Sequence, residues 1–82
     1  MNTNTNTVEV VKSNFAVAYD RLPAGIQINV RNAIMDECGW RAVATFHNKR
    51  KGIRRISPLE ARVIEKHFSK YNIVPWTGLI PT

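Results

Sequence analysis

The sequence predicts an all-α fold: a compact four-helix domain with a flexible N-terminal tail and an irregular C-terminal segment. Apolar side chains recur every three to four residues along several stretches, the spacing that places them on one face of a helix. Proline, glycine and one serine-proline pair divide these stretches where helices are expected to begin or end. The 82 residues are 44% hydrophobic and 22% charged, as is typical of a globular chain with one modest core.

The N-terminal part is expected to be a disordered tail followed by the first helix. Residues 1–6 are polar and repetitive, so ordering them would cost backbone entropy without burying apolar surface. Asn6 and Glu9 have the spacing of a capping box, which predicts a helix over residues 7–22. Its apolar stripe consists of Val8, Val11, Phe15, Ala18, Tyr19 and Leu22. Pro23 would end this helix, because the residue before a proline is disfavoured in helical geometry.

The second helix is predicted over residues 24–38. Pro23 suits its first turn, and Gly39 can end it in the left-handed conformation. The side chains expected to face the core are Ile26, Val30, Ala33, Ile34 and Cys38.

The last helix is predicted over residues 58–71. Ser57, Pro58 and Glu60 combine an N-cap serine, a first-turn proline and the glutamate of a capping box. The side chains expected to be buried are Leu59, Val63, Ile64, Phe68 and Tyr71. Residues 72–82 contain prolines and a glycine among apolar side chains, so they form an irregular segment that packs on the domain or on a second subunit.

The segment between these helices carries the strongest charge signal. Residues 41–55 contain six of the twelve Lys and Arg residues and no acid, in a chain with a net charge of +6 and a pI near 10.1. Like charges at this density repel one another and destabilise the compact state. A polyanion would compensate them, and nucleic acid is the first candidate.

Two local structures compete for this basic segment. A helix over residues 42–51 would turn Val43 and Phe46 inward and end at Gly52. Alternatively, residues 41–47 and 53–56 could form a β-hairpin wing, which their β-branched and aromatic residues would tolerate. We expect the helix, with a core that includes Phe15, Leu22, Val30, Ile34, Phe46, Val63, Ile64 and Phe68.

A helix that ends at Cys38, a turn through Gly39, Trp40 and Arg41, and a short basic helix have the layout of a helix-turn-helix. The run IMDECGWRAVATFHNKRKG, followed by ISPLEARVIEKHF, resembles small phage-repressor and Cro-type helix-turn-helix proteins, especially short regulators with a CGWS-x-x-TF turn. Arg41 replaces the serine of that pattern, and the interval from Gly39 to Phe46 is one residue longer. The resemblance implies a small transcriptional regulator of phage or mobile-element type, and repressor domains of this size suggest a homodimer.

The side chains of the segment suit two kinds of DNA contact. Asn48 can bind adenine, and Arg41 or Lys51 can reach guanine, because these base edges match their donors and acceptors. The candidate base contacts are Arg41, Thr45, His47, Asn48 and Lys51. The candidate phosphate contacts are Lys49, Arg50, Arg54, Arg55 and Ser57.

The sequence contains few signals for catalysis, metal binding or membrane insertion. No glycine-rich phosphate loop or nucleophile with a base is visible, so we expect no enzyme, no cofactor and no small-molecule substrate. Two histidines and one cysteine predict no metal site, and Cys38 is expected to be a small core residue. Neither a signal sequence nor a membrane-spanning run is expected, so the predicted location is cytoplasmic. The rival hypothesis is a basic interaction module for RNA, the ribosome or an acidic protein, with residues 41–55 as the wing.

Overall fold

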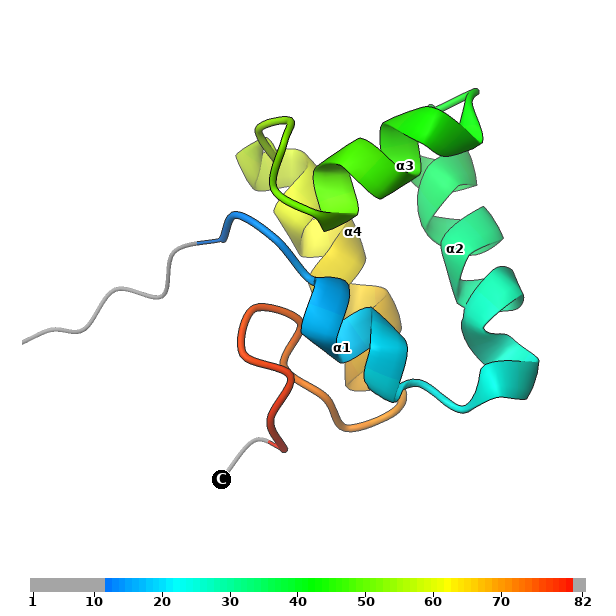
Figure 1. Cartoon of the computed structure of the whole chain (residues 1–82), viewed down its shortest axis with the longest axis vertical. Coiled ribbons are helices and arrows are strands. Elements are labelled where there is room, and N and C mark those ends of the chain that lie inside the picture. The colour runs from blue at the N-terminus through cyan, green and yellow to red at the C-terminus, as the bar shows by residue number, and fades with distance from the viewer. Residues whose placement is uncertain (1–11, 81–82) are drawn as a thin grey trace, which may run out of the picture.

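The computed structural model describes residues 12–80, which contain four helices and no strand. The helices are α1 (Ala16–Arg21), α2 (Ala24–Cys38), α3 (Val43–Arg50) and α4 (Pro58–Ser69). α2 packs against both α3 and α4, and Figure 1 shows α1 in front of α4, with α3 across the upper end of the molecule. The predicted all-α class is confirmed. The expected tail over residues 1–6 and the capping box at Asn6 lie outside the described residues.

α1 begins later than the predicted helix over residues 7–22. Residues 12–15 are not helical, and the Phe15 N–H donates to the Arg50 carbonyl at 3.1 Å. The segment before α1 therefore pairs with the end of α3 instead of extending its own helix. This was not visible in the sequence, because the partner lies 35 positions away along the chain (Phe15 to Arg50).

α2 has the predicted boundaries, and its end shapes the connection to α3. Gly39 has φ +74°, and its N–H donates to the Asp36 carbonyl at 3.3 Å. The Trp40 N–H donates to the Met35 carbonyl at 2.9 Å, which completes a Schellman-type helix end. The Trp40 side chain is thereby turned into the core.

The basic segment forms a helix, so the hairpin alternative is wrong. α3 is one residue shorter at each end than the predicted helix over residues 42–51. Gly52 ends it with φ +81°, and a Cβ at this position would lie 3.3 Å from the Ser13 carbonyl oxygen. Any side chain at Gly52 would therefore meet both backbone strain and the segment before α1.

α4 opens with the predicted capping box. The Glu60 N–H donates to Ser57 Oγ at 3.1 Å, and the Ser57 N–H donates to Glu60 Oε1 at 2.9 Å. The expected burial of Leu59 is wrong, since its side chain is 71% exposed. At about 100° per residue, Leu59 lies on the opposite side of the helix from Ile64, which is buried. Tyr71 is also exposed, because the helix ends at Ser69 before it can carry this side chain inward.

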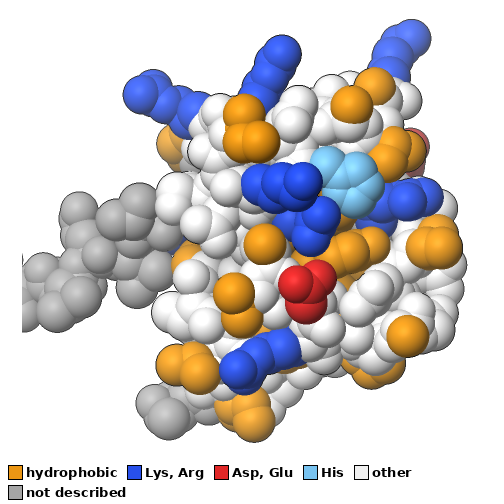
Figure 2. Space-filling view, viewed as in Figure 1, with side chains coloured by type: hydrophobic (Ala, Val, Ile, Leu, Met, Phe, Trp, Pro, Cys, Tyr) orange, Lys and Arg blue, Asp and Glu red, His pale blue; other side chains and the backbone are white. Residues whose placement is uncertain are grey.

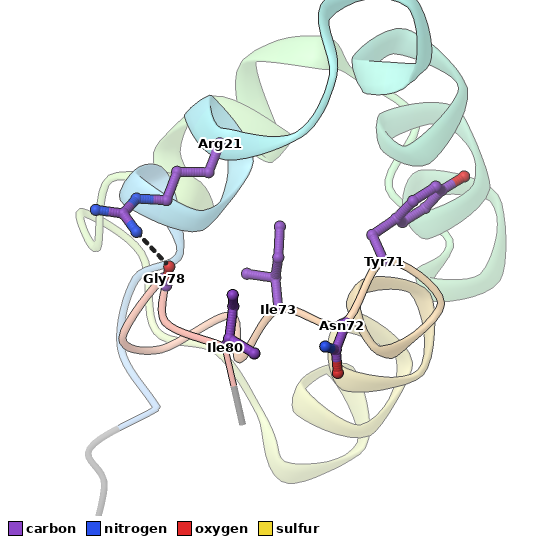
Figure 3. A pocket seen from close by; sticks show the side chains of 6 residues that line it. All are labelled: Arg21, Tyr71, Asn72, Ile73, Gly78 and Ile80. Atoms are coloured by element: carbon purple, nitrogen blue, oxygen red, sulfur yellow. Dashed lines mark hydrogen bonds between the residues drawn. The ribbon is translucent and has the colours of Figure 1, made fainter. Parts of the chain in front are cut away.

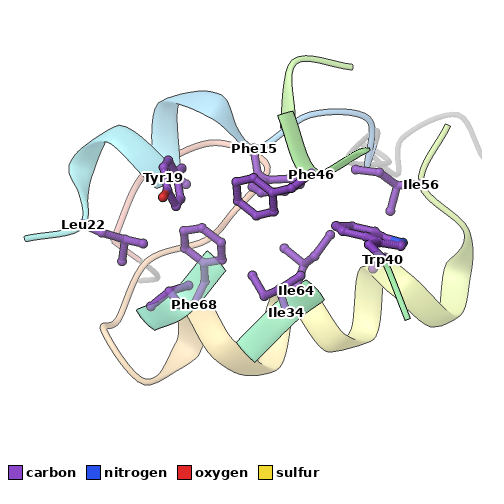
Figure 4. Close-up of a cluster of buried hydrophobic side chains, with 12 residues drawn as sticks. Phe15, Tyr19, Leu22, Ile34, Trp40, Phe46, Ile56, Ile64 and Phe68 are labelled. Atoms are coloured by element: carbon purple, nitrogen blue, oxygen red, sulfur yellow. The ribbon is translucent and has the colours of Figure 1, made fainter. Parts of the chain in front are cut away.

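The core is built mainly from aromatic and branched side chains, shown in Figure 4. Phe15 lies at its centre, with its ring edge-on to those of Phe46 and Phe68 at centroid distances of 5.5 and 5.9 Å. Of the predicted core, Val63 is only half-buried, whereas the others are buried. The buried set also contains residues outside that list, namely Ala18, Tyr19, Trp40, Ile56, Ala61 and His67.

Residues 72–80 pack back on the domain. Trp76 Nε1 donates to Glu65 Oε2 at 2.8 Å, and its ring lies edge-on to Phe15 at 6.4 Å. Figure 3 shows the Arg21 guanidinium bonded to the Gly78 carbonyl, at 3.0 Å, beside a pocket that Ile73 and Ile80 line. No helix among the described residues is long and apolar enough to cross a membrane.

Candidate nucleic-acid interface

α3 has one buried side chain, and this fixes which way the others point. Phe46 is fully buried against Phe15, Tyr19 and Trp40. Because residues three and four positions apart share a helix face, Lys49 and Arg50 flank Phe46 on the inner side. The opposite side is left to the residues predicted as base contacts.

Lys49 is turned inward, contrary to the prediction that it contacts phosphate. Its Nζ lies 2.9 Å from Glu60 Oε1 and donates to the Arg55 carbonyl at 2.6 Å. It also stands over the Trp40 ring at 5.4 Å, and only 13% of its side chain is exposed. Its charge is therefore compensated within the domain.

Arg50 is likewise held by the domain. Its guanidinium lies 3.7 Å from Asp20 Oδ1 and 5.6 Å from the centroid of the Tyr19 ring, and 17% of its side chain is exposed. The predicted phosphate contact is therefore not a free surface cation. The acids that compensate Lys49 and Arg50 are Glu60 of α4 and Asp20 of α1. Residues 41–55 therefore carry less uncompensated charge than their own lack of acids predicted.

Ser57, a predicted phosphate contact, is bound to Glu60 at the start of α4. Its N–H and its hydroxyl both belong to the capping box with Glu60. The Glu60 carboxylate at the start of α4 repels a second anion and accepts the Ser57 N–H. Ser57 is thus placed as the N-cap of α4, and its contact with phosphate stays a prediction.

Of the five predicted base contacts, Asn48 and Lys51 lie on the outer side of α3, opposite Phe46, while Thr45 and His47 lie on its two flanks and Arg41 lies just before the helix. Arg41 and Lys51 are exposed, while Thr45, His47 and Asn48 are half-exposed. Within residues 12–80, no hydrogen bond involves the Asn48 side-chain amide, and no ion pair involves Arg41 or Lys51. Figure 2 shows Lys and Arg side chains along the edge that α3 and the following loop occupy, with a histidine among them.

The loop after α3 adds two more cations. Arg54 and Arg55 are both exposed and form no ion pair with any described residue. The loop leaves α3 in a fixed direction, because the Ile53 and Arg54 N–H groups both donate to the Asn48 carbonyl, at 2.9 and 3.2 Å. The predicted phosphate contacts that remain exposed cations are therefore Arg54 and Arg55, beside the outer face of α3.

Arg31 of α2 is a cation near this face that the sequence analysis missed. Burial is the main cause that lowers the pKa of His47, and the charges of Arg50, Lys51 and Arg31 lower it further. The sequence offered no signal for this proximity, because α2 and α3 are brought into contact only by the fold. The Arg31 guanidinium itself donates to Asn32 Oδ1 at 3.3 and 3.2 Å, so the interface is formed by α3 and the loop after it.

The described residues contain no cluster of three or more His, Cys, Asp or Glu side chains that could hold a metal ion. Cys38 is half-buried, and this burial raises the pKa of its thiol to about 11. The thiol is therefore protonated at neutral pH and a poor nucleophile.

Comparisons with protein-family models, with curated proteins and with solved structures found no match for this chain.

Proposed function

We propose that this chain binds double-stranded DNA with sequence preference, as a small transcriptional regulator of phage or mobile-element type. In this proposal α2, residues 39–42 and α3 act as a helix-turn-helix, whose turn is about three to four residues long. α3 lies in the major groove, which is wide enough for a helix. The class of regulator follows from the sequence resemblance alone.

One observation carries the proposal. Arg41 and Lys51 at the ends of α3, with Arg54 and Arg55 in the loop, are exposed cations without an acid partner among residues 12–80. The polar side chains between them can form hydrogen bonds with base edges. Cations on both sides of a row of hydrogen-bonding groups suit duplex DNA, whose phosphates lie on either side of the base edges in the groove.

The roles divide along this surface. Arg41, Thr45, His47, Asn48 and Lys51 face the bases, whereas Arg54 and Arg55 lie over the phosphates. Phosphate contacts release counterions, so they make affinity depend on salt, whereas base contacts set the preference for one sequence.

The test is a salt titration of binding to a labelled random duplex, with a charge-matched control. Replacing Arg54 and Arg55 together by Ala should flatten the slope of log affinity against log salt by about two units. The control replaces Arg62 of α4 and Lys70, the residue after α4, by Ala, which also removes two charges. It should leave the slope unchanged, because neither residue belongs to α3 or to the loop after it, and Lys70 follows the end of α4 that lies far from α3 in Figure 1.

Equal losses in the two double variants would mean that the protein attracts any polyanion, and the proposal would fail. Binding to an acidic protein but not to duplex would favour the interaction-module alternative. A sequence-preferring protein keeps a ratio between its preferred duplex and random duplex as salt rises.

A further inference from the structure

His47 and Arg50 form a contact that the general DNA-binding proposal does not use. Arg50 Nε donates to His47 Nδ1 at 3.3 Å, between residues one helical turn apart. The guanidinium that donates is itself fixed, because Asp20 and the Tyr19 ring hold it from α1. Tyr19 is anchored in turn, since its hydroxyl donates to the Gln27 carbonyl at 3.1 Å. The donor thus contacts α1 as well as His47.

This contact sets the chemistry of the imidazole. A neutral histidine has one ring nitrogen that donates and one that accepts. Since Nδ1 accepts from Arg50, the proton of the neutral ring lies on Nε2. His47 then offers one N–H of known position, on the flank of the outer face of α3.

We propose that His47 is a specificity-determining residue that donates its Nε2–H to a purine in the major groove, with Arg50 as its positioning residue. This inference rests on the proposed DNA binding. Guanine is the best match, because its N7 and O6 both accept hydrogen bonds, whereas cytosine presents an N4 donor that a lone N–H cannot bind. Arg41 and Lys51 are also donors, and the outer face of α3 carries no acid, so guanine, which presents two acceptors, is favoured on the contacted strand.

Protonation of His47 at low pH should weaken the preference for one DNA sequence while it strengthens binding to any duplex. A proton on Nδ1 removes the acceptor for Arg50 and adds a positive charge among Arg50, Lys51 and Arg31. The ring is then attracted to any phosphate but has lost the contact that orients it. The folded domain lowers the pKa of His47, so the ring takes up its proton below pH 6.5, the ordinary histidine value. As pH falls from 7.5 to well below 6.5, we expect affinity for random duplex to rise and the ratio between preferred and random duplex to fall.

The binding test begins with selection of a preferred site from a randomised duplex library by the full chain. Each guanine of that site is then replaced singly by 7-deazaguanine, which lacks the N7 acceptor. We expect one replacement to weaken binding of the wild type about five- to tenfold, the range for one hydrogen bond. His47→Ala should show no such loss at that guanine, and His47→Gln, which retains an N–H donor, should recover part of it.

Arg50→Lys separates positioning from charge, because lysine keeps the charge but lacks the planar Nε–H donor. It should reduce the 7-deazaguanine effect while leaving binding to random duplex within about twofold. Circular dichroism of each variant checks that the fold is retained. ¹⁵N spectra of the imidazole in the free wild type should show the Nε2–H form, and a predominant Nδ1–H form would overturn the inference without any DNA.

The two proposals fail in different ways. If the wild type enriches no sequence, DNA recognition itself fails and His47 has no role in it. If the wild type enriches a site but His47→Ala retains every 7-deazaguanine effect, then DNA binding stands and this role of His47 is wrong.

Discussion

The indole Nε1–H of Trp40 donates to Glu60 Oε2 at 2.9 Å, which joins the turn after α2 to the first turn of α4. The other carboxylate oxygen accepts from Lys49 of α3 and from the Ser57 N–H. One carboxylate therefore joins the turn after α2, α3 itself and the start of α4. Glu60 thereby helps to position the outer face of α3, although the sequence identified it only as part of a helix cap.

Replacing Glu60 by Ala should destabilise the domain by about 2–4 kcal/mol. The change removes a cap worth about 1 kcal/mol and leaves the indole N–H and Lys49 without their acceptor. Urea unfolding followed by tryptophan fluorescence would measure it. Asp36→Ala is the control, since this carboxylate is exposed and forms no ion pair with a described residue, and a change within ~0.5 kcal/mol is expected. Similar losses in the two variants would contradict the role of Glu60.

The same carboxylate should make stability depend on pH. Burial raises the pKa of Glu60, but hydrogen bonds from Ser57, Lys49 and Trp40 outweigh it, so the pKa lies below the ordinary value of 4.5. A lowered carboxyl pKa stabilises the folded state above the unfolded pKa, and this contribution is lost as pH falls through the folded pKa. Between pH 6 and 3, wild type should lose more stability than Glu60→Gln. Some loss should persist in the variant, because a hydrogen bond from Lys66 also lowers the pKa of Glu37.

The sequence predicted best what depends on local signals. Gly39 and the Ser57–Glu60 capping box determine helix ends through neighbouring backbone groups, and both were found as predicted. The start of α1 was missed, because the Phe15 N–H is bound by the distant Arg50 carbonyl.

The inward direction of Lys49 could have been predicted. It lies three residues after Phe46, so helical spacing places it on the side of the one buried side chain of α3. The same spacing also predicted Val43 inward, and that expectation is wrong, since Val43 is 42% exposed. Its acid partner could not have been found by counting charges within residues 41–55, because Glu60 lies on another helix. Charge runs are read along the chain, whereas ion pairs form in space.

Lys49 and Lys51 form a matched pair that separates fold from binding. Lys49→Met should lower stability by about 1–3 kcal/mol, because a partly buried carboxylate loses its cation, and should leave the salt slope of DNA binding unchanged. Lys51→Met should leave stability within ~0.5 kcal/mol and flatten the slope by up to one unit. Urea unfolding and anisotropy titrations of the same samples provide both values. A flattened slope in Lys49→Met alone would reverse the assignment of these side chains.

α4 provides a test of which face is buried. Phe68→Ala should cost ~3–5 kcal/mol, because the fully buried ring contacts Phe15 and its removal leaves a cavity. Leu59→Ala, an equally apolar truncation on the exposed side, should change the free energy of unfolding by no more than ~0.5 kcal/mol. A large loss at Leu59 in dilute solution would mean that this side chain is buried within the domain, and the assignment of the buried face of α4 would be wrong.

The homodimer hypothesis can now be tested without unfolding the domain. Trp76 binds Glu65 and Phe15 of its own chain, so deleting residues 73–82 would damage the core as well as any contact between subunits. Leu79 and Ile80 are 57% and 69% exposed, so they are the apolar side chains of this segment left to a partner. Both are replaced by Lys. At a micromolar concentration where the wild type is monomeric, the double variant should have the same unfolding midpoint as the wild type. Light scattering at increasing concentration should show the wild type approach twice its monomer mass while the double variant stays at one. A wild type that remains monomeric at high concentration would rule out the self-association, and paired half-sites would then have to be bound by two independent monomers.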